Sequence, residues 1–361
     1  MLDFNLSGRN YFDALPQPVL VYGTTIEYCN DAARDVLEQL GADVEVGAPA
    51  PELLPPAEQC PCVVTLTGGV WQAALRPLEG LALCQLSRLS NARELPEQIR
   101  MLAQGLRRQL SNTGLSLEYL QNNLSELEQQ RSRESIATLN RSFLQLLRLM
   151  DHLDLYTRTP EELTAISPPR PVELHDFCVW LHLEVEPLVR QLGRSFALDL
   201  APGPLYVQVN RNLLYRICCN LISNALHAGG DLHLKLRPNR SHTEAVLTLS
   251  DNAGGIDPNR LSTLFLPENQ TEQGGLALGL PLSARLSQLY PGASLLFAAK
   301  EHGSSVSLSL PLYLDEGGRP LSELREDPEA QRPGVESGFS LLLTELSDVL
   351  PGSMYTQDDV F

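Results

Sequence analysis

Two asparagines and two glycine-bearing stretches are the residues of this chain best suited to bind a charged ligand. Asn220 and Asn224 lie four residues apart in an apolar segment of helical spacing, so both fall on one helical face, where amide oxygens can ligate Mg²⁺. Glycines let backbone amides approach a polyphosphate closely. They stand at Gly254 and Gly255 in the first stretch and at Gly275 and Gly279 in the second. The set predicts a site for nucleotide phosphates and their metal ion.

An aspartate completes this candidate site. Asp251 follows the apolar run 245–249, and its carboxylate can accept a hydrogen bond from the amino group of adenine. The chain contains no Gly-x-x-x-x-Gly-Lys-Ser/Thr sequence, so a P-loop is excluded. Glycine clusters can also be simple turns, but their ordered combination with the asparagines favours the nucleotide site.

The order and spacing of these motifs resemble the ATP-binding domain of histidine kinases, the Bergerat fold shared with heat-shock ATPases, type II topoisomerases and mismatch-repair ATPases. The matching segments are residues 210–227 for the N box, 251–256 for the G1 box, 264–265 for a short F box, 275–280 for the G2 box and 302–311 for the closing strand. The resemblance covers about residues 172–313 and implies an α/β sandwich there.

The resemblance also implies roles for individual residues and the cofactors ATP and Mg²⁺. Asn224 is then the magnesium ligand, Asn220 a contact on the phosphate side and Asp251 the adenine contact. The other ATP-binding residues that it implies are His227, Gly254, Gly255, Gly275, Leu276, Gly279 and Leu280.

Two long helices are expected in residues 91–158, followed by a linker over 159–171. Apolar residues recur at alternating spacings of four and three from Leu102 to Leu127 and again from Ile136 to Leu153. A helical hairpin with such seams buries them best against a second copy, which predicts a homodimer held by a four-helix bundle through residues 94–157. In histidine kinases this position holds the dimerisation and phosphoacceptor module.

The hairpin departs from the family at the phosphoacceptor. Aligned on Leu106, Arg107 and Leu110, the acceptor motif places Gln104 where the phosphorylated histidine stands, and an amide is not a usable phosphoryl nucleophile. Gly105 replaces the acidic neighbour. We therefore assign no catalytic residue.

Two other residues are candidates for chemistry near the site. His152, on the second helix, is expected to be an exposed histidine near the helix end rather than an acceptor. Arg216 is the one nearby cation that the sequence offers for a transferred phosphate, with a solvated helix residue as the alternative, because the short lid segment 266–273 carries two acids and no Lys or Arg.

Two functions remain open on these residues. The first is a degenerate kinase that binds ATP and Mg²⁺ and regulates a partner through its nucleotide state. The second is an active ATP-dependent kinase, either a histidine kinase or a serine kinase of the anti-sigma type, or a slow ATPase. Gln104 and the absence of Lys and Arg from the lid segment favour the first. In either case the partner is expected to be a response regulator or another signalling protein.

The N-terminal part, residues 1–90, is expected to be a small α/β domain. Short apolar runs alternate with turn residues and one helical stretch at 30–40. Residues 14–22 and 26–33 resemble the opening of PAS sensor domains. Ligand sensing and a purely dimerising role both remain open for it. The fold class is therefore α+β multidomain: a PAS-like domain, a helical hairpin and an ATP-binding sandwich.

Composition and charge limit the expected partners and the expected location of the protein. The net charge of -17 over 361 residues disfavours nucleic acid as a partner. No apolar run approaches the ~18 residues of a membrane span, and the first residues lack the basic start of a signal peptide, so we expect a cytoplasmic protein without membrane insertion. The seven cysteines are expected to be small buried hydrophobes.

The last part of the chain, residues 314–361, is expected to be a linker followed by a tail. The linker is rich in Gly, Pro, Glu and Arg. In the tail, Phe339, Leu342, Leu343, Leu346 and Leu350 recur at helical spacing. This pattern indicates a short helix docked on the body of the protein or, alternatively, a motif that recruits a partner.

Overall fold

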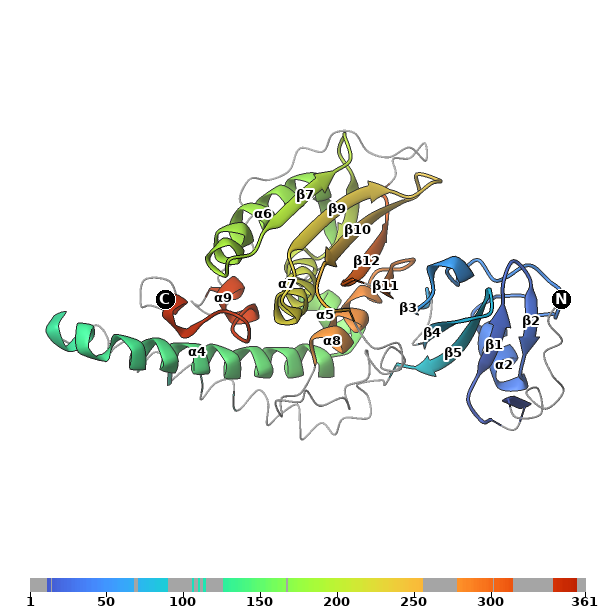
Figure 1. Ribbon diagram of the computed structural model, residues 1–361, viewed down its shortest axis with the longest axis horizontal. Helices are drawn as coiled ribbons and strands as arrows, with labels where there is room; N and C mark the ends of the chain where they lie inside the picture. Colours follow the sequence, from blue (N-terminus) through green and yellow to red (C-terminus); the bar gives the residue numbers. More distant parts are fainter. Residues whose placement is uncertain are drawn as a thin grey trace.

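The structure is a computed structural model, shown in Figure 1. It describes residues 12–89 except 14 and 68–70, then 106, 110, 113 and 114, and then 126–166, 168–255, 278–300, 302–313 and 340–355. An N-terminal α/β unit lies at one end, a long helix runs beneath a second α/β unit, and the C-terminal segment lies between that helix and the second unit.

The N-terminal unit is a five-stranded antiparallel sheet in the order β2-β1-β5-β4-β3. Its elements are β1 (Val19–Tyr22), β2 (Ile26–Cys29), α2 (Asp31–Gln39), the 3₁₀ turn η1 (Ala57–Gln59), β3 (Cys62–Thr65), β4 (Trp71–Leu78) and β5 (Leu81–Arg88). Asn30 fixes the start of α2, because its side-chain oxygen accepts hydrogen bonds from the backbone amides of Ala33 and Val19, each at 2.9 Å. The sequence prediction of a small α/β domain is confirmed.

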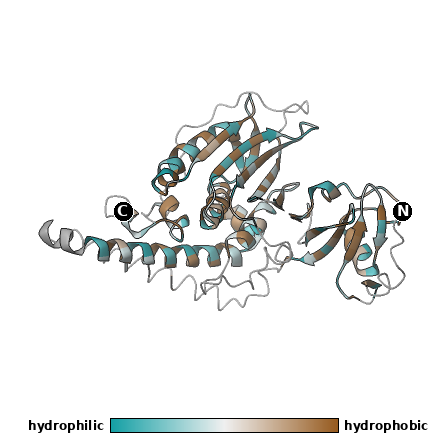
Figure 2. Cartoon of the chain, in the orientation of Figure 1, coloured by the Kyte–Doolittle hydropathy of each residue, from teal (hydrophilic) through white to brown (hydrophobic). Residues whose placement is uncertain are grey.

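The long helix α4 (Glu126–Thr157) is followed by α5 (Pro160–Ile166). Its buried side includes Phe143, Leu144 and Leu147, which join the main hydrophobic core. The hydropathy colouring of Figure 2 alternates between hydrophobic and hydrophilic residues along α4. Two seam leucines remain on the surface: Leu139 is 55% exposed and Leu146 is 50% exposed. Most of the first helix of the predicted hairpin, including Gln104 and Gly105, lies outside the described residues.

The second α/β unit begins with β6 (Arg170–Glu173), α6 (Leu174–Gln191), β7 (Phe196–Leu200), β8 (Tyr206–Val209) and α7 (Arg211–Ala228). It continues with β9 (Leu232–Pro238), β10 (Glu244–Asp251), α8 (Gly279–Ser287), β11 (Ser294–Ala299) and β12 (Ser304–Pro311). The strand order is β11-β12-β10-β9-β7, with β7 parallel to β9. Alternate residues of β10 are buried, as expected for a sheet with one face against helices. This unit is the sandwich that the sequence predicted.

The sheets of the two units join where β3 lies next to β11, and together they form one ten-stranded sheet. The two strands pair antiparallel, with Phe297 opposite Val63. The hydroxyl oxygen of Thr65 accepts a hydrogen bond from the amide of Leu295 at 2.8 Å. Two segments 230 residues apart thus share backbone pairing. The sequence patterns did not predict this contact.

The C-terminal segment, defined here as residues 340–355, contains α9 (Leu341–Glu345) and the 3₁₀ turn η6 (Gly352–Met354). Figure 1 shows it between α4 and the helices of the second unit. Its apolar side chains are buried in the main core: Leu341, Leu342, Leu343, Leu346, Leu350 and Tyr355. The docked alternative from the sequence is therefore the one that the structure has, although the helix is only five residues long.

The cysteines meet one further expectation in the described residues. Six of the seven cysteines are buried, Cys60 is half-buried, and all seven are free of disulfides. Among the described helices, none combines the length and the apolar character that a bilayer span requires.

Candidate nucleotide site

Helix α7 positions the two predicted asparagines. The side chain of Asn210 caps the helix by accepting from the amide of Leu213, and Gly229 ends it in the left-handed conformation with φ 87°. Asn220 is fully buried, whereas Asn224 and His227, further along the helix, are exposed. The asparagine proposed as magnesium ligand is therefore open to solvent, and the one proposed on the phosphate side is enclosed.

Asn220 lies at a junction of three helices. Its side-chain oxygen accepts a hydrogen bond from Arg148 of α4 at 3.3 Å. A Cβ added to Gly279, the first residue of α8, would lie 3.5 Å from the same oxygen. The buried Nδ2 of Asn220 has no hydrogen-bond partner in the part of the chain that the structure describes. A buried amide left without an acceptor is costly, so this group is suited to an acceptor that a ligand brings.

Asp251 ends β10 and is buried. One carboxylate oxygen accepts from the amide of Ala253 at 3.0 Å, and the other accepts from the hydroxyl of Ser304 at 2.5 Å. A carboxylate can accept about four hydrogen bonds, so capacity remains for an exocyclic amino group. Gly303, at φ 88°, is required beside it, because a Cβ there would lie 1.9 Å from the backbone oxygen of Asp251. Ser304 and Gly303 belong to the closing strand motif, yet no local sequence pattern places them at this carboxylate.

The predicted glycines are only partly described. Gly254 and Gly255 lie in the segment that follows the end of β10 at Asp251, and Gly255 has φ 76°. Gly279 and Leu280 form the first turn of α8, which has no side-chain cap at its N-terminus, so the first amides are not satisfied by a capping side chain. Gly275, Leu276 and the lid segment 266–273 lie outside the described residues.

These residues fit an adenine nucleotide. Asp251 offers a buried carboxylate with spare acceptor capacity, Asn220 a buried amide without an acceptor, and Asn224 an exposed amide on the same helix. When bound, ATP with Mg²⁺ would supply the transferable phosphoryl group. Its adenine would be held by Asp251 and its metal by Asn224.

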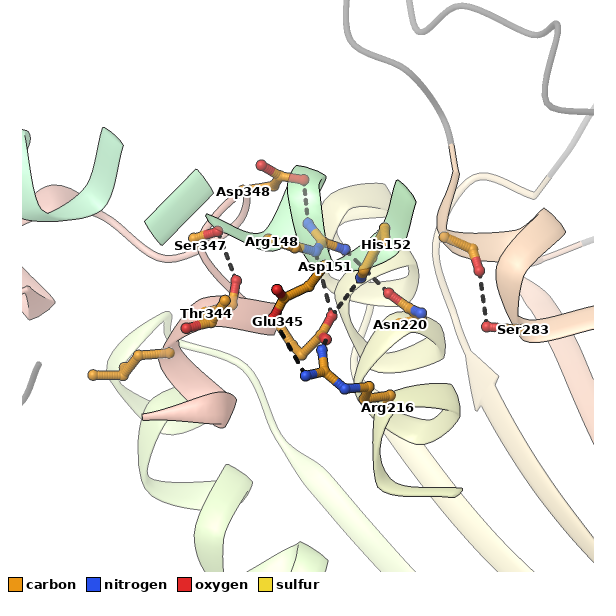
Figure 3. Close-up of polar contacts among 12 residues, drawn as sticks. Arg148, Asp151, His152, Arg216, Asn220, Ser283, Thr344, Glu345, Ser347 and Asp348 are labelled. Atoms are coloured by element: carbon orange, nitrogen blue, oxygen red, sulfur yellow. Dashed lines mark hydrogen bonds and ion pairs between the residues drawn. The ribbon is translucent and has the colours of Figure 1, made fainter. Parts of the chain in front are cut away.

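A buried cluster of charged residues adjoins Asn220 (Figure 3). At its centre is Glu345 of α9, whose side chain is fully buried. Its carboxylate lies 2.6 Å from Arg216 of α7, 2.8 Å from Nε2 of His152 and 3.5 Å from Arg148. Arg216 also lies 3.3 Å from Asp151, and Arg148 forms an ion pair with Asp348.

The electrostatics of Glu345 reflect two opposing effects. Burial alone raises the pKa of a carboxyl group, whereas His152, Arg216 and Arg148 lower it. The lowering effect of these three residues exceeds the raising effect of burial, and the pKa of Glu345 falls from 4.5 to about 2. Glu345 is therefore ionised at neutral pH, despite its burial.

This cluster corrects two interpretations of the sequence. His152 was expected to be exposed near the helix end, but its side chain is buried and contacts Glu345. Arg216 was weighed as a solvated residue or a phosphate contact, but it is buried between Glu345 and Asp151. The exposed position of His152 and the solvated alternative for Arg216 were wrong, because the partner, Glu345, lies more than a hundred residues away in sequence. A phosphate contact through Arg216 stays a prediction.

One other group in the described residues has the composition of a metal site: Glu173, His175 and Asp176. The Glu173 carboxylate accepts hydrogen bonds from the amides of His175, Asp176 and Leu205. It therefore caps α6, which accounts for its position.

Comparison with known proteins agrees with this geometry. Residues 209–314 match the family of histidine kinase-, DNA gyrase B- and HSP90-like ATPases, which supports ATP binding. Residues 9–67 match a PAS domain family.

Relatives of the chain include sensor kinases. Sensor histidine kinase RppB of Synechocystis sp. is 28% identical over 186 residues, which is 49% of this chain and 40% of the relative. The C4-dicarboxylate transport sensor protein DctB of Rhizobium meliloti is 36% identical over 108 residues, 28% of this chain and 17% of the relative. This chain thus spans less than half the length of these two relatives.

Among solved structures, full-length ShkA in complex with AMPPNP aligns with a TM-score of 0.49 and 19% identity, over 60% of this chain and 46% of that chain. The two domain matches and the sensor kinase relatives together support a place for the chain among the sensor histidine kinases.

Proposed function

We propose that this protein is a degenerate histidine kinase that binds ATP with Mg²⁺ and regulates a partner through its nucleotide state, without phosphorylating a histidine of its own. The observation that carries the proposal is the position of His152. It is the only histidine within residues 91–158. Its side chain is 5% exposed and its Nε2 lies 2.8 Å from Glu345.

A phosphoacceptor must present an unencumbered nitrogen to the γ-phosphate. His152 is enclosed by α9 and tied to a carboxylate, so it does not meet this condition. Gln104, at the aligned acceptor position, carries no nucleophilic nitrogen at all. Neither residue of the hairpin therefore supports histidine phosphorylation.

Nucleotide binding is supported by different residues. The matched ATPase family spans the segment that contains Asn220, Asn224 and Asp251. The spare capacity of the Asp251 carboxylate and the unpaired amide of Asn220 are the features that an adenine nucleotide would use. We assign Asn224 as the magnesium ligand.

Regulation of a partner protein requires that this chain assemble with other chains. Leu139 and Leu146 lie seven residues apart on α4 and are about half exposed, which favours a homodimer through the hairpin. A response regulator or another signalling protein is the partner class that this architecture would serve.

The test is incubation of the full chain with γ-labelled ATP, followed by separate acid and base treatment. We expect no label on the chain under conditions in which ATP binds. Acid-labile, base-stable label that disappears in His152→Ala would contradict the proposal. Label that survives acid would favour the serine kinase alternative.

A further inference from the structure

The C-terminal segment brings two carboxylates to a pair of arginines beside the proposed phosphate side of the site. Glu345 lies 2.6 Å from Arg216 and 3.5 Å from Arg148. Asp348 forms a second ion pair with Arg148. The arginines come from different helices, α4 and α7, so the segment joins them (Figure 3).

Arg148 connects this cluster to the nucleotide site. Its guanidinium donates to the oxygen of Asn220 at 3.3 Å, next to the first turn of α8. Asn220 is fully buried and accepts this hydrogen bond from Arg148, so a phosphate that reached the Asn220 side chain would lie close to the Arg148 guanidinium. An arginine in that place offers planar, bidentate donors for phosphate oxygens.

The charges decide what this region can bind. With the segment docked, Arg148 and Arg216 face three carboxylates, those of Glu345, Asp348 and Asp151. Of these three carboxylates, that of Asp151 would be the one left beside the arginines without Glu345 and Asp348. The docked state therefore repels a triphosphate, and the undocked state would attract one.

We propose that Arg148 and Arg216 form a receptor for the terminal phosphate of a nucleoside triphosphate, and that the C-terminal segment fills this receptor with its own carboxylates. The inference rests on the proposed nucleotide-binding function. Segment and terminal phosphate then compete for the same cations, and by linkage each weakens the binding of the other. A diphosphate lacks the competing group and is affected much less.

The segment is held by more than charge. Arg141 of α4 donates to the backbone oxygen of Ser347, and Asn140 donates to that of Tyr355. Its leucines are part of the main core. Point variants of the acidic side chains are therefore better tests than truncation, which would expose apolar surface.

Two variants of the full chain test the proposal by calorimetry with Mg-ATP and Mg-ADP. Glu345→Gln removes the central charge, and we expect it to tighten Mg-ATP by about tenfold with little change for Mg-ADP. Asp348→Asn removes a half-exposed charge and should tighten Mg-ATP by about threefold. The Asp348→Asn variant alone still tests the proposal if Glu345→Gln fails to fold. Asp199→Asn is the matched control, because Asp199 of the edge strand β7 is a half-exposed partner of Arg237 on the neighbouring strand β9.

Hydrogen exchange supplies the reciprocal measurement. Mg-ATP, but not Mg-ADP, should raise the exchange of amides 341–350 in the wild-type chain. Unchanged or weaker Mg-ATP binding in the acidic variants, with Mg-ADP still bound, would overturn this inference alone. Absence of binding of either nucleotide to the wild-type chain and to every variant would instead overturn the proposed function and this inference with it.

Discussion

Glu345 and Arg216 form a fully buried ion pair at 2.6 Å, although 129 residues separate them in the sequence. The pair joins the C-terminal segment to α7, the helix that carries Asn220 and Asn224. Removing one partner of a buried ion pair leaves an uncompensated charge, which is far more costly than losing a surface pair. The pair thus couples the position of the C-terminal segment to that of α7.

The stability of the protein should depend on Glu345 in acid. Its pKa in the folded chain is about 2, below the ordinary 4.5, so its ionised form stabilises the fold. That stability is fully present above about pH 4.5 and is lost as the pH falls from about 4.5 towards 2. Glu345→Gln should therefore lower the free energy of unfolding by on the order of 3 kcal/mol at pH 7. The difference from wild type should shrink as the pH is lowered to 3.

Urea unfolding at pH 7, 5 and 3 measures this dependence. Glu186→Gln is the control, since Glu186 forms an i,i+4 pair with the exposed Arg190 and should cost less than about 1 kcal/mol. A difference between wild type and Glu345→Gln that stays constant from pH 7 to pH 3 would show that the carboxylate charge is not what stabilises the docked segment.

Dimerisation should depend on the exposed seam of α4. Leu139→Glu combined with Leu146→Glu should give monomers, because an unpaired charge in a bundle core costs several kcal/mol. Both leucines are half exposed in the single chain, so the fold of the chain itself should survive. Light scattering gives the mass.

Leu183→Glu provides the comparison for this pair, because Leu183 is 67% exposed on α6, outside the hairpin. It should leave the mass unchanged. A dimer that persists in the double variant, or that is lost equally in Leu183→Glu, would place the interface elsewhere.

The continuous sheet predicts that the N-terminal unit and the ATP-binding unit stabilise each other. Thr65→Val leaves the amide of Leu295 without its acceptor on β3, which should cost about 1–3 kcal/mol. Exchange of the Leu295 amide should become faster. Thr164→Val is the control, because the Thr164 hydroxyl bonds only to the backbone of its own exposed helix. Equal protection of Leu295 in both variants would mean that the β3–β11 pairing does not persist in solution.

The sequence predicted those parts of the site that depend on local motifs. The N box predicted α7, and the apolar run before Asp251 predicted β10, because helical spacing and strand alternation are properties of neighbouring residues. The helix at 30–40 was also recovered, since Asn30 is a typical N-cap.

The remaining features depend on contacts between distant segments. The burial of His152 follows from Glu345, 193 residues later, and the sheet joint follows from strands 230 residues apart. Nothing in the residues next to His152 or Thr65 distinguishes a surface position from a docked one. Ion pairing across the fold therefore had to come from the structure.

The central claim is that the ATP-binding unit holds an adenine nucleotide through Asp251. Calorimetry with Mg-ATP on the wild-type chain and on Asp251→Asn tests it most directly. We expect heat of binding for wild type, and an affinity weaker by about 1–3 kcal/mol in Asp251→Asn, because an amide cannot replace both acceptor oxygens of the buried carboxylate. Wild-type protein that gives no heat and no thermal shift with millimolar Mg-ATP would contradict the account.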